Sequence, residues 1–275
     1  MTIQKWLKTP KGYVAIAMIA YLLIASIGYK NIMGIKNGFV AVIVSVIVDI
    51  LCNVMKKRKW TIPDGAVITG LIISLILSTA TSLSVIAASA VIAILSKHLL
   101  VYKKKPIFNP AAFGLLISVL FFRTGQSWWG AFGDLPAWTI LFLLVGGYKI
   151  TGRINKYPQV FSFLGTSFLL LLLMGHFHIG DEVDALRPPF INATLFFGFF
   201  MLTDPPTSPA KDKEQVIFGI LTAAAGTVIY GLFGGLIYLF IGLCIGNLYC
   251  FLKKRSTSKV SMNRSNVKKT ERILG

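Results

Sequence analysis

One carboxylate of this chain lies inside an apolar run, where an ionisable group is costly. Asp49 belongs to the run 38–55 and precedes the basic block at 56–59. A charged group at this depth is expected to face other helices or a water-filled cavity rather than lipid. It would suit a proton or ion relay, or a contact with a cofactor. Snorkelling to the interface, or pairing with a neighbouring subunit, is an equally open structural explanation.

An asparagine before a proline marks a second candidate site. The segment reads Lys103-Lys-Lys-Pro-Ile-Phe-Asn109-Pro110-Ala-Ala-Phe-Gly114. Pro110 has no backbone N–H, so a helix that starts here exposes donors which, with the Asn109 amide, suit an anion or the polar edge of a ring. The same pair is also a common helix start, with asparagine as the N-cap and proline in the first turn. Both interpretations remain open.

Two threonine-containing runs resemble one another and suggest a faint internal repeat. One extends from Thr69 to Ser82 and the other from Thr194 to Ser208. Each lies in the third apolar run of a group of five, and an odd number of spans places two such groups in inverted orientation. Short, interrupted helices in inverted repeats commonly form a binding site near the midplane of the membrane. Thr69 and Thr194 are therefore candidates for such a site.

Two further carboxylates stand at the ends of these runs. Asp64, directly after Pro63, opens the first, and a role as helix N-cap is favoured over catalysis. Asp204 closes the second within Thr203-Asp-Pro-Pro-Thr207, where two adjacent prolines end the helix. Asp204 and Thr207 would cap a turn there, or help to line the cavity beside a broken helix.

The sequence does not support metal or nucleophilic chemistry. The cysteines have no CxxC spacing, so each is expected to be a small buried hydrophobe, with an iron–sulfur ligand shared with another subunit as the less favoured alternative. The histidines form no pair suited to a haem, and no phosphate-binding loop, dinucleotide fingerprint or serine-nucleophile motif is present. No catalytic residue and no metal site is predicted. The residues concerned are Cys52, Cys244, Cys250, His98, His176 and His178.

The composition indicates that membrane helices position these side chains. Of the 275 residues, 55% are hydrophobic and 14% are charged, whereas soluble domains carry roughly 25% charged residues. Apolar runs long enough, or nearly long enough, to cross the hydrocarbon follow one another along the chain. The chain is therefore predicted to be an all-α polytopic membrane protein. Its ten predicted spans are 12–29, 38–55, 64–80, 82–100, 108–122, 132–148, 158–176, 188–203, 215–233 and 234–251.

The basic residues predict the orientation of these spans. If the N-terminus lies inside, only Lys30, Lys36, Arg123 and Arg187 of the 28 Lys and Arg residues fall in outside loops, which leaves 24 inside. This excess matches the positive-inside rule, with both termini in the cytoplasm of a bacterial cell. The same rule explains the net charge of +18 without a nucleic acid partner, and none is predicted.

Five parts of the chain follow from this topology. The predicted boundaries are 1–11 for the cytoplasmic N-terminus, 12–122 for the first five-helix repeat, 123–136 for a short extracytoplasmic loop, 137–251 for the second repeat and 252–275 for a basic cytoplasmic tail. The tail is polar and rich in serine, so we expect a disordered arm against anionic lipid headgroups. Docking of a cytoplasmic partner is the less favoured alternative.

Several of these motifs, in this order, resemble the RnfD/NqrB family. The resemblance is carried by 108–114, by 194–208 and by Val216-Ile-Phe-Gly219, while Asp64–Gly70 fits the family's third helix. The family comprises the flavin-bearing membrane subunits of Rnf complexes and of sodium-translocating NADH:quinone reductases. Its similarity covers roughly 10–252. It implies ten helices in two inverted five-helix repeats, as in urea transporters, with flavin between the repeats and electrons carried across the membrane, sometimes with Na⁺ or H⁺.

The resemblance also suggests which residues bind the cofactor. The implied partners are other membrane redox subunits and an extracytoplasmic flavoprotein, and Asp49, because of its place inside an apolar run, stays the candidate proton or ion relay. The candidates for lining a flavin site (riboflavin or FMN) are Asp64, Thr69, Asn109, Pro110, Thr194, Asp204 and Thr207.

One departure from the family pattern affects the expected cofactor chemistry. Typical members carry a large insertion between helices five and six, with a threonine that is esterified by FMN. Here that loop is only 123–136, and its single threonine, Thr124, lacks the motif. We therefore expect any flavin to be bound non-covalently within the membrane. A transporter or channel for a small solute, or for a flavin itself, on the same fold is the alternative.

The short outer loop also contains two adjacent tryptophans. Trp128 and Trp129 would present a docking surface to an extracytoplasmic partner, or serve as ordinary interfacial aromatic residues, which the sequence favours.

Overall fold

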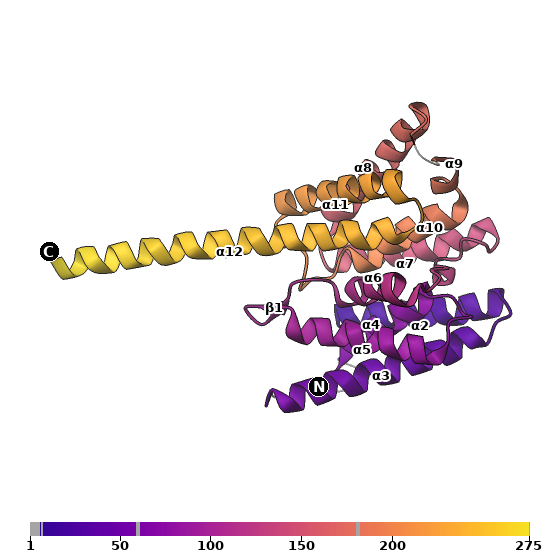
Figure 1. Cartoon of the computed structure of the whole chain (residues 1–275), viewed down its shortest axis with the longest axis horizontal. Coiled ribbons are helices and arrows are strands. Elements are labelled where there is room, and N and C mark those ends of the chain that lie inside the picture. The colour runs from indigo at the N-terminus through magenta and orange to yellow at the C-terminus, as the bar shows by residue number, and fades with distance from the viewer. Residues whose placement is uncertain (1–5, 7, 59–60, 180–181, 275) are drawn as a thin grey trace.

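Helices form almost all of the regular structure (Figure 1). The computed structural model describes the backbone of residues 6, 8–58, 61–179 and 182–274, and the side chains of these residues up to 256 except that of Glu182. The predicted N-terminal segment 1–11 therefore lies partly outside the described residues. The predicted all-α membrane architecture is confirmed.

Each of the ten predicted spans contains a helical segment. In the first half these are α2 (Pro10–Gly28), α3 (Met33–Met55), α4 (Asp64–Ile76), α5 (Leu83–Leu99) and α6 (Pro110–Phe122). In the second half they are α7 (Ile140–Arg153), α8 (Tyr157–His176), α10 (Pro188–Phe196) with the π-helical turn η3 (Phe197–Met201), α11 (Asp212–Phe233) and α12 (Ile237–Leu274). Shorter elements join them: the hairpin strands β1 (Val101–Tyr102) and β2 (Lys105–Pro106), the 3₁₀ turns η1 (Trp129–Ala131) and η2 (Ala137–Thr139), and α9 (Glu182–Ala185).

Helix length separates two groups of segments. Within the described residues, α2, α3, α8, α11 and the first part of α12 are long and apolar enough to cross a membrane. The helices α4, α6 and α10 with η3 are shorter but apolar, as expected for broken or tilted segments. A crossing by all ten segments and the inverted relation of the halves remain predictions.

The two halves pack in the same order. In the first half α3 packs on α5 and α5 on α6; in the second α8 packs on α11 and α11 on α12. The first half, indigo to magenta, and the second, pink to yellow, lie as two layers (Figure 1). They meet where α6 contacts α12 and where α2 contacts α7. Repeated packing order is what a structural repeat would produce.

Close contact between helices depends on glycine within both halves. A Cβ added to Gly70 of α4 would lie 2.8 Å from the backbone C and O atoms of Ala41 in α3. A Cβ on Gly242 of α12 would lie 2.6 Å from the carbonyl oxygen of Thr222 in α11. Small residues at such crossings let helices approach closely, which drives packing in membranes, where lipid is as apolar as the protein interior.

The loop 123–136 folds inward and forms a plug over the end of α4, at what we call the outer end of the bundle. Gln126 pairs with Leu77, and the Ser127 and Trp128 N–H groups both donate to the Ile76 carbonyl at 3.0 Å. The Trp129 Nε1–H donates to the Ser74 carbonyl at 2.8 Å. These bonds satisfy backbone groups that the short helix α4 leaves unpaired at its end.

The plug corrects the expectation for its two tryptophans. Trp128 and Trp129 are only 2% and 4% exposed, so they are neither a docking surface nor interfacial residues. Trp128 stacks on Phe240 of α12 at 5.5 Å between ring centroids, and it contacts Phe196 of α10 edge-on at 6.1 Å. The Trp128 ring therefore fills the junction with the second half, whereas Trp129 packs against Tyr29 of the first half at 6.5 Å between ring centroids.

The C-terminal tail also differs from its prediction. The backbone of α12 continues as helix to Leu274 rather than ending near 252, so a disordered arm is not what the structure shows. This helix projects well beyond the bundle (Figure 1). The β1–β2 hairpin lies at the same end, which we call the basic end. Side chains of the tail beyond residue 256 lie outside the described residues, so its contact with anionic lipid stays a prediction.

Candidate functional site

A cavity of about 160 Å³, the inner cavity, lies between the two halves near the basic end. The first half contributes residues from α2, α4, α5 and the start of α6, and the second half contributes Ile154, Phe200 and the segment 203–206. Four of the seven predicted cofactor-binding residues line it: Thr69, Asn109, Pro110 and Asp204. Residues that are remote in sequence thus meet at one place.

Asn109 ties the two halves together at this cavity. It is the N-cap of α6, since its Oδ1 accepts a hydrogen bond from the Ala112 N–H at 3.0 Å. Its Nδ2 donates to the carbonyl oxygen of Met201 in the second half at 2.9 Å. Its backbone N–H donates to Asn247 Oδ1 of α12 at 2.9 Å. Asn109 therefore caps α6, and it also links α6 to the Met201 segment and to α12. In addition it borders the inner cavity.

Asp204 and Thr207 form a compact turn after the π-helical segment. Thr207 Oγ1 donates to Asp204 Oδ2 at 2.9 Å, and Ser208 Oγ donates to the Asp204 carbonyl at 2.8 Å. Burial raises the pKa of Asp204 above its usual value. The turn interpretation and the cavity interpretation both hold for Asp204, because its side chain also lines the inner cavity.

Thr69, Asp64 and Thr194 occupy different positions relative to the inner cavity. Thr69 lines it, and its Oγ1 donates to the Gly65 carbonyl at 2.8 Å. Asp64 is the first residue of α4 rather than its N-cap, which is Pro63. Its carboxylate pairs with Lys11 Nζ at 2.7 Å near the cavity. Thr194 is buried elsewhere and shares a hydrogen bond of 3.0 Å with the Tyr238 hydroxyl.

Asp49 is paired within the chain. Its side chain is almost fully buried, and its Oδ1 accepts hydrogen bonds from Lys97 Nζ and His98 Nε2, both at 2.8 Å. A wide depression of about 650 Å³, the vestibule, is lined by these three residues together with Lys11 and Asp64. Because Lys11 and Lys97 also line the inner cavity, two ion pairs separate it from the vestibule.

His98 is a partner that sequence reasoning missed. It sits at the end of a predicted span, next to Lys97, with no second histidine to suggest a site. Its Nδ1 is buried and has no hydrogen-bond partner within the described residues. The only signal was positional: Asp49 and the Lys97–His98 pair both fall shortly before the basic ends of their spans.

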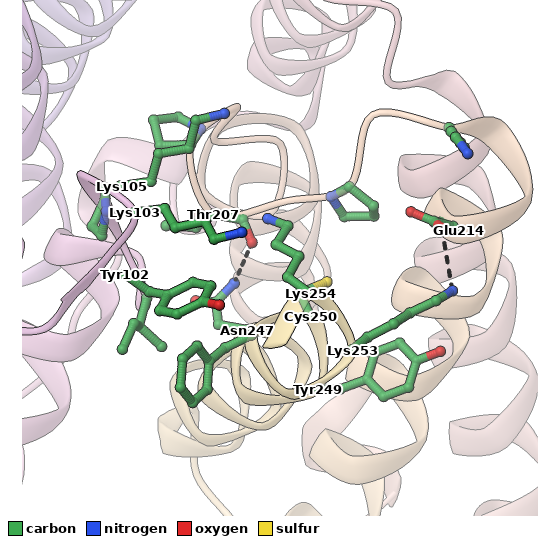
Figure 2. Close-up of a pocket in the computed structure, with 16 residues that line it drawn as sticks. Tyr102, Lys103, Lys105, Thr207, Glu214, Asn247, Tyr249, Cys250, Lys253 and Lys254 are labelled. Carbon is green, nitrogen blue, oxygen red and sulfur yellow. Dashed lines mark hydrogen bonds and ion pairs between the residues drawn. The ribbon is translucent and has the colours of Figure 1, made fainter. Parts of the chain in front are cut away.

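A second depression, of about 500 Å³ at the basic end, was also missed. This basic basin is lined by the β1–β2 hairpin, by the loop 206–211 and by α12, with the side chains shown in Figure 2. Thr207 lines it, and Pro106 and Pro206 line both the basin and the inner cavity. In the sequence its lysines indicate only topology, because nothing there shows that three separate segments converge.

A buried lysine nearby makes the free energy of unfolding depend on pH. Lys156, between α7 and α8, is 4% exposed and donates to the Pro209 carbonyl. Burial lowers its pKa from 10.5 to about 8, although the charge of Asp204 opposes the shift. Between these pKa values the unfolded chain binds more protons than the folded chain, so the free energy of unfolding rises with pH in that window.

This shift predicts a measurable change in stability. From about pH 7.5 to about pH 10, the wild type should gain about 2 kcal/mol relative to Lys156→Met, which has no proton to lose. Unfolding titrations in mixed micelles at each pH would measure the difference. Parallel pH profiles for the two proteins would contradict the lowered pKa.

The side chains that line the inner cavity suit a flavin better than the volume of the cavity does. The inner cavity offers Lys97, Asp204 and the apolar side chains of Ile72 and Phe200, which suit a ring with polar edges. Its volume of about 160 Å³ is below the roughly 300–1,000 Å³ usual for small-molecule sites. The adjoining basin, at about 500 Å³, lies within that range. A flavin held at the inner cavity would therefore have to extend into the basin, or the shared wall would have to open.

Comparison with known proteins identifies the family. Two stretches, residues 4–134 and 125–238, match the sequence model of the NQR2, RnfD, RnfE family, and together they span most of the chain. No curated protein sequence matches the chain. The chain therefore belongs to the NQR2, RnfD, RnfE family, the membrane subunits of Rnf- and Nqr-type complexes.

Proposed function

We propose that this chain is an electron-carrying subunit that holds a flavin non-covalently at the junction of its two halves, across the inner cavity and the adjoining basin. The observation that carries the proposal is the convergence of Thr69, Asn109, Pro110 and Asp204 on the inner cavity, with Thr207 lining the basin beside it. A bound flavin would supply a carrier that accepts and passes on electrons within the complex.

The chain's own residues would hold and shield such a ligand. Lys97 and Thr69 face the cavity with polar groups, and Ile72 and Phe200 provide apolar walls. Behind the cavity, Phe200 contacts Tyr21 edge-on at 5.5 Å between ring centroids, and Tyr21 contacts Phe132 of the plug at 5.4 Å. This row of rings separates the cavity from the outer end and would exclude water there.

The proposed orientation places the basic end in the cytoplasm. It follows from the positive-inside rule and from the position of the lysine-rich hairpin and α12 at one end of the bundle (Figure 1). Other membrane redox subunits are the proposed partners. If an extracytoplasmic flavoprotein docks at the outer end, it would contact residues other than the buried Trp128 and Trp129.

Asp49 is the proposed residue for any coupled proton or ion. Its carboxylate is held between Lys97 and His98 at the vestibule, and Lys97 also borders the inner cavity. A change of charge in that cavity would therefore act on the Asp49–Lys97 pair directly, because Lys97 borders the cavity and charges interact strongly in a medium of low polarity.

The test is the visible absorbance of the protein purified in detergent, before and after acid precipitation. We expect flavin peaks that acid releases into the supernatant. Thr69→Val should lower the flavin content per protein, because it removes a hydroxyl from the cavity. Thr194→Val is the matched control and should leave the content unchanged, since Thr194 lies elsewhere.

Two results would contradict this proposal. Colour that stays in the acid pellet would show covalent attachment and would direct attention to Thr124 in the plug. A protein that stays colourless after incubation with FMN or riboflavin would exclude a bound flavin and favour a transporter for a small solute.

A further inference from the structure

The basic basin concentrates positive charge from separate parts of the chain. Its lining includes five lysines, two from the hairpin, one from the loop before α11 and two from α12: Lys103, Lys105, Lys211, Lys253 and Lys254. Glu214 is the single carboxylate among the lining residues, and it pairs with Lys253 at 3.3 Å. The lining thus carries a net charge of +4, and like charges brought together repel one another unless an anion joins them.

The hairpin holds its lysines in an unfavourable backbone conformation. Tyr102 pairs with Lys105 across the two strands, so Lys103 and Lys104 form a two-residue turn. Both have positive φ, 48° and 67°, as in the turn type that strongly prefers Asn-Gly. Lysine is strained there and asparagine is not. Turn geometry therefore disfavours lysine at both positions, and the chain nevertheless places Lys103 at the basin.

The basin combines these cations with a rigid polar floor and aromatic walls. Asn247 is 1% exposed, accepts from the Asn109 N–H and donates to the Thr207 carbonyl at 3.3 Å. The side chains of Lys103 and Lys254 both extend toward this hydrogen bond (Figure 2). Tyr102 packs edge-on against Phe251 with 5.3 Å between ring centroids.

We propose that the basic basin is a binding site for a phosphate ester with an apolar or planar remainder. Several lysines around one cavity suit a phosphate, whose charge exceeds that of a carboxylate, and lysine binds it as a point charge. The rings would contact the remainder. Two sources share this chemistry: the headgroup of an anionic phospholipid, because the basin adjoins the end of the apolar part of α12, and a soluble phosphorylated ring such as FMN. The inference rests on the basin's charges and stands whether or not the proposed electron transfer is correct.

Two double variants test the site. Lys103→Asn with Lys254→Gln removes two lining cations, while asparagine keeps the turn. Lys104→Asn with Arg255→Gln removes the same charge from neighbouring positions that do not line the basin, and is the matched control. Unfolding titrations of both establish that they are folded. Each protein is then titrated with FMN and with riboflavin, and its retained phosphatidylglycerol is counted by native mass spectrometry.

Each outcome decides the inference. FMN binding about tenfold or more tighter than riboflavin, lost in the basin variant only, assigns the basin to a soluble phosphate. Equal or absent binding of both flavins, with phosphatidylglycerol lost in the basin variant only, assigns it to a lipid headgroup. If neither FMN preference nor retained phosphatidylglycerol differs between the two variants, the inference is wrong. Equal binding of FMN and riboflavin in every protein would then still support the proposed flavin function.

Discussion

Replacing Asn109 with alanine should lower the free energy of unfolding by about 2–4 kcal/mol. The change removes the cap of α6 at Ala112 and leaves the buried Met201 carbonyl with only the long hydrogen bond of 3.5 Å from the Asp204 N–H. Loss of a cap costs about 0.5–2 kcal/mol, and an unsatisfied buried polar group costs about 1–3 kcal/mol. Unfolding by SDS in mixed micelles, followed by tryptophan fluorescence, measures the loss.

Asn109→Ser separates the two contributions. Serine is also a good N-cap but is too short to reach Met201, so about half of the loss should be recovered. If alanine and serine destabilise the protein equally, the cap contributes little and the link between the halves dominates. If neither variant is destabilised, Asn109 does not join the halves as described, and contact with a bound ligand becomes the better explanation of its place at the cavity.

Replacing Gly70 with alanine should also destabilise the protein strongly. The new methyl group would lie 2.8 Å from backbone atoms of Ala41 and Val42, which cannot rotate away as a side chain could. Forcing α3 and α4 apart should cost about 1–3 kcal/mol, or more if the inner cavity distorts with them. The same unfolding assay would measure this, and flavin content would report on the cavity.

Gly165→Ala is a control in which the free energy of unfolding should stay the same or rise rather than fall. Gly165 also lies within a helix, α8, but an added Cβ meets nothing within 4 Å. Alanine should therefore be neutral or stabilise by up to about 1 kcal/mol, since it favours helix over glycine. If Gly70→Ala were as harmless as Gly165→Ala, helix packing at Gly70 would be looser than the structure describes.

Much of the architecture could be predicted because membranes impose simple rules. Apolar length predicted where helical segments lie, and prolines with the caps at Asn109 and Thr9 explain where α6 and α2 begin. Family motifs and the faint repeat also indicated residues that meet at the inner cavity. Their role toward a cofactor remains a prediction.

What the sequence could not reveal depends on contacts between remote segments. The plug exists because Gln126 and Leu77 pair across nearly fifty residues of sequence, and no local pattern encodes such a pairing. The pairing of His98 with Asp49 and the convergence of lysines on the basic basin are of the same kind. Polarity alone also predicted disorder for the tail, although its residues continue the helix that α12 begins.

The aromatic plug has an energetic consequence for any complex that this chain serves. A potential of about 100 mV across a membrane stores about 2.3 kcal/mol for each elementary charge. That energy is lost whenever a chain of water molecules lets ions return. Trp128, Phe132 and Tyr21 fill the junction of the halves with closely packed rings, and no water column fits between rings in contact. The short outer loop therefore closes this junction to water, so that ions would not leak back through it if the complex that this chain serves builds a gradient.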